Sequence, residues 1–414
     1  MYYSVKMFFD NGGGQCYIIS VGIYQAKPAI DLRGDPGTNA TTMYGLQDGL
    51  EALALEDEPT LIVIPEAVKL TSTEYQTLVQ AVLLQCERLR DRFAIFDIYD
   101  GENSLDASLL SKNRGYFGNN SLKYGAVYYP FLKTTLNFYV NDGETNVSVT
   151  PPAGSDATAT ATVSVAGVIT GIAVNSGGTG YTSAPKVVIT AAAPVAANLV
   201  SLKTPNTALY NFVKSALKEH FVVLPPSGAV AGIYAATDSN RGVWKAPANV
   251  SLANVIEPVI KLDNARQDDL NVDATTGKSI NAIRAFMGKG TLVWGARTLA
   301  GNDNEWRYIP VRRFFSVVEE SVKKSTYWAV FEPNDANTWV KVRGSIENYL
   351  TQKWREGALA GATPKEAFFV KCGLGITMTA IDILEGRMNV EIGMAVVRPA
   401  EFIILKFSHK LQTS

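Results

Sequence analysis

Two carboxylates follow an apolar run and could, by type and position, do chemistry. Asp97 and Asp100 lie at the C-terminal end of a predicted strand at 93–98 (FAIFDI), where α/β enzymes place catalytic or metal-binding carboxylates. No histidine or cysteine is close to them in sequence, and the segment 100–103 (DGEN) is equally typical of a turn or a helix cap. We therefore expect a turn here, with a catalytic or metal site as the alternative.

Histidine and cysteine are scarce and dispersed. A Ser-His-Asp or Cys-His enzyme needs a histidine base held by a carboxylate, and neither His220 nor His409 lies in such a motif. His220 is expected at the C-terminal end of a helix, where it complements the dipole. Zinc sites draw on several His and Cys ligands, whereas Cys16, Cys86 and Cys372 are far apart. We expect reduced, buried cysteines and no catalytic, cofactor-binding or metal residues.

Two glycine-rich segments could be mistaken for phosphate-binding loops. Such a loop follows a strand and opens a helix, but the glycines of 11–14 (NGGG) precede a predicted strand at 15–22. The segment 288–290 (GKG) lacks both the spacing and the Ser or Thr of a P-loop. Both segments predict turns that use positive φ angles.

Composition limits the class of protein. The 414 residues predict two or three domains, and 47% hydrophobic with 19% charged residues exclude general disorder. With 38 basic and 39 acidic side chains, no charge bias suggests a nucleic-acid or membrane-surface partner. No apolar run approaches the roughly 20 residues that span a bilayer, and no signal peptide begins the sequence. We expect assembly in the cytoplasm, without direct membrane insertion, of a protein that packs against itself.

The first third of the chain alternates apolar runs with helical periodicity. Thr71 and Glu74 form a capping box that opens one helix. This order predicts an α/β class with mainly parallel strands. The predicted elements are a strand at 15–22, a helix at 42–56, a strand at 61–64, a helix from 71 with Tyr75, Leu78, Val79, Val82, Cys86 and Leu89 on one face, and a strand at 93–98.

Composition changes sharply after Gly143. Between Thr145 and Leu199 the only charged residues are Asp156 and Lys186, and β-branched residues alternate with glycine-containing turns. We expect three parts: an α/β region at 1–143, a small all-β insertion at 144–200 that faces outward, and a mixed α/β assembly domain at 201–414.

Two helices are predicted beyond the insertion. One spans 206–220, with Leu209, Phe212, Val213, Ala216 and Leu217 expected to be buried. The other spans 338–356, with one apolar arc (Trp339, Val342, Ile346, Tyr349, Leu350 and Trp354) and an opposite arc (Lys341, Asn348, Gln352 and Arg355) that has no acidic residue. Arg343 and Lys353 lie at the edges of the apolar arc. The basic arc is either a contact surface or a solvated face.

The chain ends in two strand-like runs at 388–397 and 401–407. The side chains of the last run, Phe402, Ile403, Ile404, Leu405 and Phe407, are candidates for an arm that adds a strand to another subunit's sheet. An ordinary hairpin within one domain is the alternative for at least one of the two runs.

Six segments in order resemble the contractile tail sheath family of phages, R-type bacteriocins and phage-tail-like injection systems. They cover most of 201–414 and part of 1–140, and leave the β insertion outside the match. They are FFDNGGGQCYI at 8–18, PPSGAVAGIYAATDSNRGVWKAPAN at 225–249, INAIRAFMGKGTLVWGARTL at 280–299, WRYIPVRRFF at 306–315, WAVFEPN at 328–334 and WREGALAGATPKEAFFVKCG at 354–373.

The resemblance implies a mechanical function. Sheath subunits stack as rings around an inner tube and contract to drive the tube through a target envelope, linked by terminal arms. The implied partners are further copies of the chain, the inner tube protein, and baseplate and terminal cap proteins. Lys341, Arg355, Arg343 and Lys353 are then candidates to face the tube. Family members usually carry a further N-terminal segment with a donated arm, so we expect that segment either upstream of Met1 or missing.

Two other classes of function stay open at this stage. A nucleotide- or sugar-binding α/β enzyme would use the strand ends around Asp97. A self-assembling shell or surface-layer protein would share self-association but form sheets or closed shells.

Overall fold

The computed structural model describes residues 1–22, 33, 44–104, 106–139, 155–163, 169–179, 199–204 and 207–401. The chain divides into two compact units, one of Met1–Leu136 with Val222–Ser414 and the other of Asn137–Phe221. The three-part division at 143 and 200 stays a prediction.

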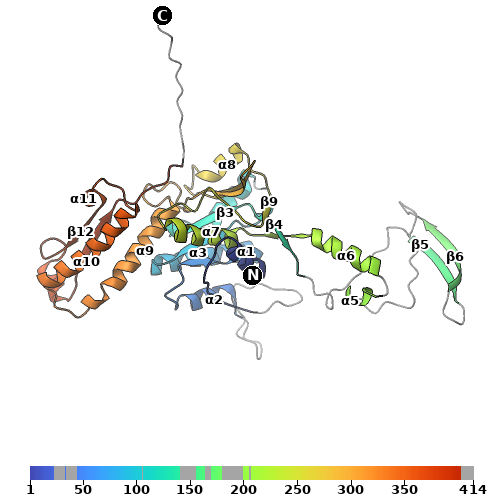
Figure 1. Cartoon of the computed structure of the whole chain (residues 1–414), viewed down its shortest axis with the longest axis horizontal. Helices are drawn as coiled ribbons and strands as arrows, with labels where there is room; N and C mark the ends of the chain where they lie inside the picture. The colour runs from blue at the N-terminus through green and yellow to red at the C-terminus, as the bar shows by residue number, and fades with distance from the viewer. Residues whose placement is uncertain are drawn as a thin grey trace, which may run out of the picture. The chain divides into compact units, whose positions relative to one another are not determined.

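A six-stranded sheet forms the centre of the larger unit (Figure 1). Its first four strands pair in parallel and its last two are antiparallel. The mixed α/β class, with a mainly parallel region, is therefore confirmed. In sheet order the strands are β1 (Leu61–Val63), β2 (Phe93–Asp97), β3 (Gly125–Tyr129), β10 (Asn281–Phe286), β11 (Gly290–Trp294) and β8 (Val250–Ser251).

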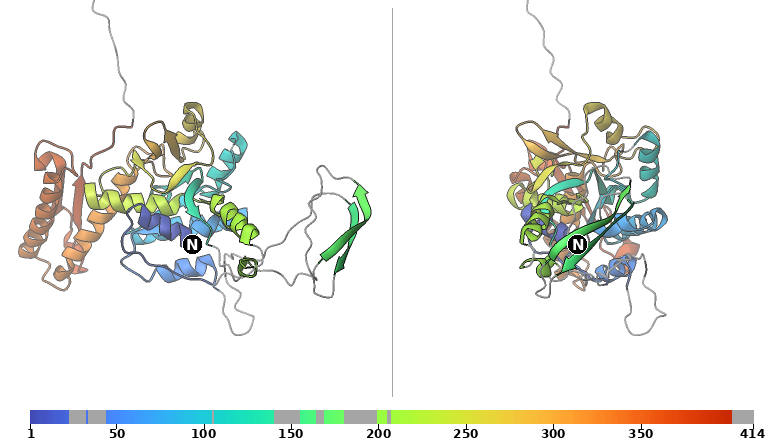
Figure 2. Two further views of the ribbon diagram at one scale, coloured as in Figure 1. Left: turned by 45° about the vertical axis from the view of Figure 1, so that its right-hand side comes forward. Right: turned by 90° about the vertical axis from the view of Figure 1, so that its right-hand side faces the viewer.

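Helices cover both faces of this sheet, because its inner strands are apolar on both sides (Figure 2). In β2, Phe93 and Ile95 join the core on one face, while Ala94 and Phe96 join the core on the other. The first face packs against α1 (Tyr2–Asp10) and α7 (Ser227–Arg241), and the second against α3 (Ser72–Leu89) and α4 (Ala107–Tyr116).

The capping box that the sequence predicts is present at the start of α3. The Thr71 hydroxyl accepts from the Glu74 amide at 3.4 Å, and the Glu74 carboxylate accepts from the Thr71 amide at 3.0 Å. The helix then buries the predicted face, from Tyr75 to Cys86. Local capping and helical periodicity agree here, which explains why this element was predictable.

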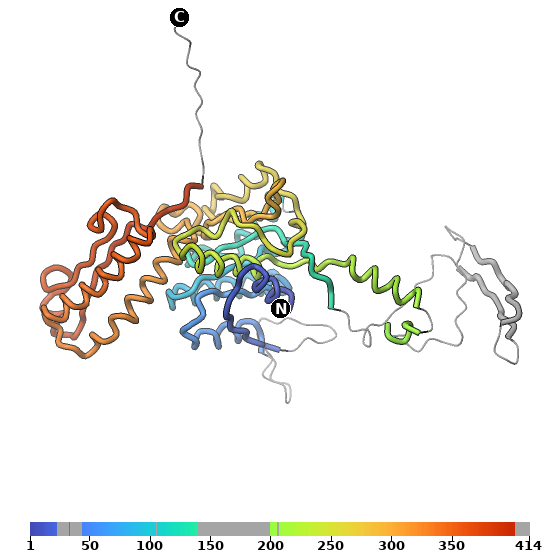
Figure 3. Tube along the Cα trace, viewed as in Figure 1, coloured from blue at the N-terminus to red at the C-terminus, as the bar shows by residue number. Residues whose placement is uncertain are grey.

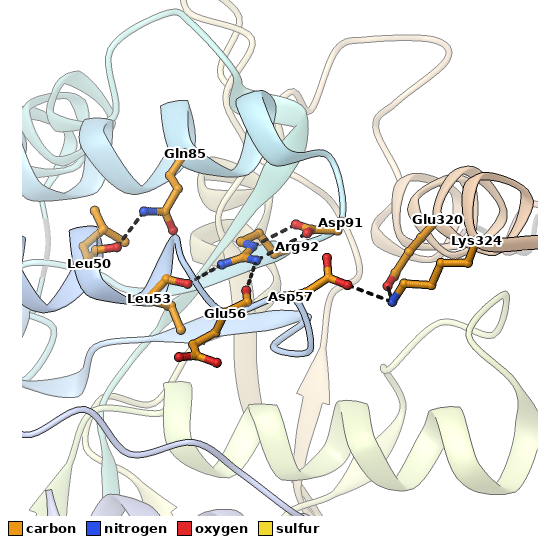
Figure 4. A network of polar contacts seen from close by, with 9 residues as sticks. All are labelled: Leu50, Leu53, Glu56, Asp57, Gln85, Asp91, Arg92, Glu320 and Lys324. Carbon is orange, nitrogen blue, oxygen red and sulfur yellow. Dashed lines mark hydrogen bonds and ion pairs between the residues drawn. The ribbon is translucent and has the colours of Figure 1, made fainter. Parts of the chain in front are cut away.

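A buried arginine fixes the end of α2 (Leu46–Leu53), as Figure 4 shows. Arg92 is 1% exposed and donates to the carbonyls of Leu53 and Glu56 at 3.0 and 2.7 Å. The Leu53 carbonyl also accepts from the Glu56 amide at 3.2 Å, and a cationic donor suits carbonyls at the C-terminus of a helix. Asp91 pairs with the same guanidinium at 2.8 Å.

The same region contacts a helix from much later in the chain. The Lys324 ammonium lies 3.2 Å from the Asp57 carboxylate, just beyond α2 (Figure 4). This exposed ion pair joins α2 and its loop to α9 (Ile309–Ser325).

The predicted strand at 15–22 is wrong. These residues have no regular secondary structure and pair with no strand in the part of the chain that the structure describes, and Tyr17 and Ile18 are mostly exposed. Cys16 is exposed as well, contrary to expectation, whereas Cys86 and Cys372 are buried. An apolar run predicts a strand only where a neighbouring strand can pair with it.

In its described residues, the smaller unit contains a pair of strands and two helices. Strands β5 (Ser155–Val163) and β6 (Ile169–Thr179) pair antiparallel, and α5 (Leu199–Leu202) precedes α6 (Thr207–Glu219). The expected burial of the α6 side chains is wrong: none is buried, and Phe212 is 70% exposed. Helical periodicity identifies a face suited to burial but not the partner that covers it.

A third core lies in the C-terminal part of the larger unit (Figure 3). Helices α9 and α10 (Ala336–Arg355) pack with the antiparallel pair β12 (Phe368–Cys372) and β13 (Val390–Met394).

A further sheet consists of β7 (Phe221–Leu224), β4 (Leu132–Asn137) and β9 (Val255–Pro258). The other α-helices are α8 (Asn264–Asn271), α11 (Pro364–Ala367) and α12 (Ala380–Leu384). Within the described ranges, no helix is both long and apolar enough to cross a bilayer.

Candidate functional site

The two carboxylates that could have formed an enzyme site have structural roles. Asp97 is buried, and its carboxylate accepts from the Ser227 amide at 2.7 Å and the Ser227 hydroxyl at 2.5 Å. Burial raises the pKa of Asp97 to about 7, opposed by these hydrogen bonds. Asp100 has a positive φ of 56° and its carbonyl accepts from the Asn103 amide, so the predicted turn is confirmed. Asp97 joins the end of β2 to the start of α7.

The glycine-rich segments are turns, as predicted. Gly12 has a φ of 93° after α1, and Gly288 and Gly290 have φ angles of 74° and 77° in the turn between β10 and β11. His220 directly follows the last residue of α6, and His409 lies outside the described residues.

An open groove of about 500 Å³ lies beside β1. Its walls come from α1, α2, α7 and residues 14–21, and they are mainly apolar. Each acidic lining residue already has a partner: Glu58 accepts from the Tyr17 hydroxyl, Glu66 pairs with the N-terminal amine, and Asp238 pairs with Arg313. The described lining residues thus contain no free base beside a nucleophile.

Helix α10 has the two arcs that the sequence predicts. Val342, Ile346 and Leu350 are buried against α9 and β12, whereas Lys341 and Arg355 are exposed. Among the described residues, no ion pair joins Lys341 or Arg355 to an acid.

The two other candidates on α10 are already engaged. The Arg343 guanidinium lies 3.7 Å from Glu347, and the Lys353 ammonium lies 2.7 Å from Glu356 and over the ring of Trp244. The free positive charge of the helix therefore sits on Lys341 and Arg355.

The sheet of β12 and β13 has two strands only, so each strand has a second edge without a strand partner in the described chain. The run at 388–397 thus lies in a pairing within one subunit, which was the ordinary alternative for that run. The arm candidates at 402–407 lie outside the described residues.

Two segments of this region, 327–331 and 374–384, carry exposed apolar side chains. The side-chain amide of Asn334 donates to the Arg387 carbonyl at 3.0 Å. This hydrogen bond joins the α9–α10 loop to the loop that follows α12. Phe331 is fully exposed and holds a left-handed backbone with a φ of 69°. We name this set of exposed side chains the apolar tip; it comprises Tyr327, Trp328, Val330, Phe331, Leu374, Ile376, Ile381 and Leu384. Exposed apolar groups in such number are typical of a contact surface.

Two adjacent arginines near the start of α9 have partners in other parts of the larger unit. Arg313, 7% exposed, makes a bidentate pair with Asp238 of α7 at 2.9 and 2.5 Å and lies over the ring of Tyr234. The Arg312 guanidinium lies over the Trp306 ring, with its central carbon 4.6 Å from the ring centroid. The contacts of Arg313 with Asp238 and Tyr234 hold α9 against α7.

Comparison with known families decides what kind of protein has this arrangement. Residues 178–299 match the family model of the phage tail sheath protein central domain, and residues 301–410 match that of the phage tail sheath C-terminal domain. Together the two matches span more than half of the chain. The chain belongs to the phage tail sheath family. Its members are structural proteins, not enzymes, so the α/β enzyme alternative is excluded.

Solved structures of contractile injection systems contain chains similar to this sheath protein. It resembles the sheath of the extracellular contractile injection system PVC in the contracted state, with 29% identity and a TM-score of 0.62 over 99% of this chain and 80% of that one. A chain of the anti-feeding prophage baseplate in the contracted state gives 28% identity and a TM-score of 0.66 over 98% and 83%.

Curated relatives match over shorter stretches. The tail sheath protein of Enterobacteria phage T4 is 28% identical over 130 residues, which are 31% of this chain and 19% of the phage protein. A putative prophage major tail sheath protein of Pseudomonas aeruginosa (strain UCBPP-PA14) is 27% identical over 139 residues, 33% of this chain and 34% of that protein. The alignments thus span about a fifth to a third of these relatives.

Sequence reasoning missed the residues that hold this sheath protein together. Arg312 and Arg313 lie in the segment WRYIPVRRFF, which carried the resemblance, but the sequence did not show that they are buried. The signal was available in part, because adjacent arginines within an apolar helix face require buried partners.

Proposed function

We propose that this chain is a subunit that polymerises as stacked rings around an inner tube and contracts to drive the tube through a target envelope. The observation that carries the proposal is the match of both sheath domain models, in order, to a chain whose fold resembles a contracted sheath subunit. The apolar tip supports it, because side chains such as Phe331 need a partner outside the subunit.

Negative-stain microscopy of the purified protein tests this proposal. We expect hollow tubes of sheath. Flat arrays or closed shells would favour a shell or surface-layer protein instead, and dispersed particles at all concentrations would contradict self-assembly.

The C-terminal tail is proposed to link subunits by adding a strand to a neighbour. An unpaired strand edge offers main-chain donors and acceptors to any extended segment, and the sheet of β12 and β13 has such edges. Removing residues 402–414 should leave soluble subunits that do not polymerise. Removing only 411–414, beyond the strand-like run, is the matched control, and normal tubes from the longer truncation would contradict the link.

The exposed positive charge of α10 is proposed to face the inner tube. Lys341→Glu with Arg355→Glu should weaken co-assembly of sheath and tube, because both charges are free to meet an acidic surface. Lys112→Glu with Lys289→Glu, at exposed positions on other elements, changes the net charge equally. Full-length particles from both double variants would assign the α10 charges to solvent.

The remaining parts of the proposal concern place and neighbours. Baseplate and terminal cap proteins would bind the two ends of the polymer, and assembly would take place in the cytoplasm. The insertion at 144–200 would face outward, away from the tube.

A further inference from the structure

The chain returns from the C-terminal sheet to the central unit before the tail begins. After β13, the Val397 amide donates to the Ala358 carbonyl at 3.1 Å. The Arg398 guanidinium then donates to the Asn304 carbonyl at 2.9 Å. These contacts guide residues 395–401 back to the segment that follows β11.

At the end of this return, a buried arginine holds the last described residue. Arg297 is 7% exposed, and its guanidinium donates to both carboxylate oxygens of Glu401, with Nε–Oε1 at 2.8 Å and Nη2–Oε2 at 2.5 Å. The Tyr308 hydroxyl donates to the same carboxylate at 3.2 Å. We call this arrangement of Arg297, Tyr308 and Glu401 the tail clamp.

The receiving side of the clamp is fixed independently of the tail. The Arg297 Nη1 donates to the Gly301 carbonyl at 2.8 Å, and its backbone amide donates to the Asn281 side chain at 2.9 Å. The guanidinium therefore stays oriented whether or not Glu401 is present. Burial raises the pKa of Tyr308, with the Glu401 carboxylate as the next cause, so the hydroxyl stays a donor at neutral pH.

A bidentate arginine–carboxylate pair to a preoriented, buried guanidinium is among the stronger polar contacts in proteins. The Glu401 side chain belongs to none of the three apolar cores, and its described polar contacts are with Arg297 and Tyr308. We therefore expect the contact to fix where the chain leaves the central unit, and to add little to the free energy of unfolding.

We propose that the tail clamp is the root of the C-terminal arm, so that Arg297 and Tyr308 are positioning residues for the link between subunits. This inference rests on the proposed function of the tail. With the root fixed at Glu401, the thirteen residues 402–414 reach at most about 45 Å when extended. Because Arg398 keeps its contact with Asn304, releasing Glu401 frees residues 399–401 and adds roughly 10 Å of slack.

Slack weakens the link because freed residues must be ordered again when the arm docks, and because the arm's effective concentration falls. We expect Glu401→Ala to raise the protein concentration needed for tube assembly roughly tenfold, the equivalent of ordering about one further residue. Glu401→Gln keeps one acceptor and should fall between wild type and Glu401→Ala.

The test compares full-length variants by hydrogen exchange and by assembly. Amide exchange in residues 399–401 should accelerate in Glu401→Ala while peptides of β12 and β13 keep their wild-type rates. Glu391→Ala is the matched control, because Glu391 pairs with Lys371 at 3.8 Å on the exposed face of the same sheet, away from the clamp.

The outcomes separate this inference from the proposal on which it rests. If residues 402–414 are required for assembly but Glu401→Ala assembles at the wild-type concentration with unchanged exchange, the clamp does not position the arm. If the truncation itself assembles, the arm has no linking function. Should Glu401→Ala fail to fold, Tyr308→Phe removes a single donor from the clamp and must show the same effects in weaker form.

Discussion

Replacing Asp97 by asparagine should change how the stability of the subunit depends on pH. The carboxylate is buried between β2 and α7, and both of its described partners belong to Ser227. Asparagine has the same shape. Its oxygen can accept from the Ser227 amide, and its amide can donate to the Ser227 hydroxyl, so the two hydrogen bonds survive without the charge.

The sign follows from the folded pKa of about 7 against an ordinary value of 3.8. A raised carboxyl pKa means that the folded state binds the proton more tightly, so the free energy of unfolding falls as pH rises from about 4 to about 7. At 1.36 kcal/mol per pKa unit, this contribution changes by roughly 3 kcal/mol between pH 5 and pH 8. Asp97→Asn abolishes that change.

Urea unfolding followed by circular dichroism at pH 5 and pH 8 measures the effect. The free energy of unfolding of Asp97→Asn, relative to wild type, should increase by roughly 3 kcal/mol between the two pH values. Asp100→Asn, at an exposed residue in the following turn, is the control, since asparagine tolerates the left-handed backbone as well. A relative stability that stays constant, or that falls with pH, would refute the argument that burial outweighs the Ser227 hydrogen bonds.

Two further substitutions test contacts within the fold by the same urea assay. Arg313→Met leaves Asp238 without its guanidinium at a largely buried contact and should lower the free energy of unfolding by about 3 kcal/mol. A decrease below about 1 kcal/mol would show that α9 is held mainly by apolar packing. Thr71→Ala removes the N-cap of α3 and should cost about 1 kcal/mol, whereas Thr77→Ala within the same helix should cost nothing.

The sequence predicted elements whose signals are local. The capping box at Thr71 and Glu74 marks the start of α3, and β1 and β2 follow from short apolar runs. The family likewise followed from segments of fixed residue order. These features succeed because neighbours along the chain decide them.

The errors share one cause, which is that burial depends on distant partners. The run at 15–22 looked like a strand but has no strand beside it, and Phe212 looked buried but is exposed. Arg313 and Arg297 were overlooked for the converse reason, since their partners Asp238 and Glu401 lie 75 and 104 residues away in sequence. Periodicity does not reveal such pairings.

Among the described residues, the outer edges of the β12–β13 sheet have no strand partner, which exposes the subunit to unwanted strand pairing. Main-chain hydrogen bonding is blind to sequence, so a free edge recruits any extended peptide and invites uncontrolled aggregation. The cross-strand pair Lys371 and Glu391 puts both signs of charge on the exposed face of this sheet. These charges disfavour chance contacts with other β-strands, so the proposed arm would need a high local concentration to add a strand here.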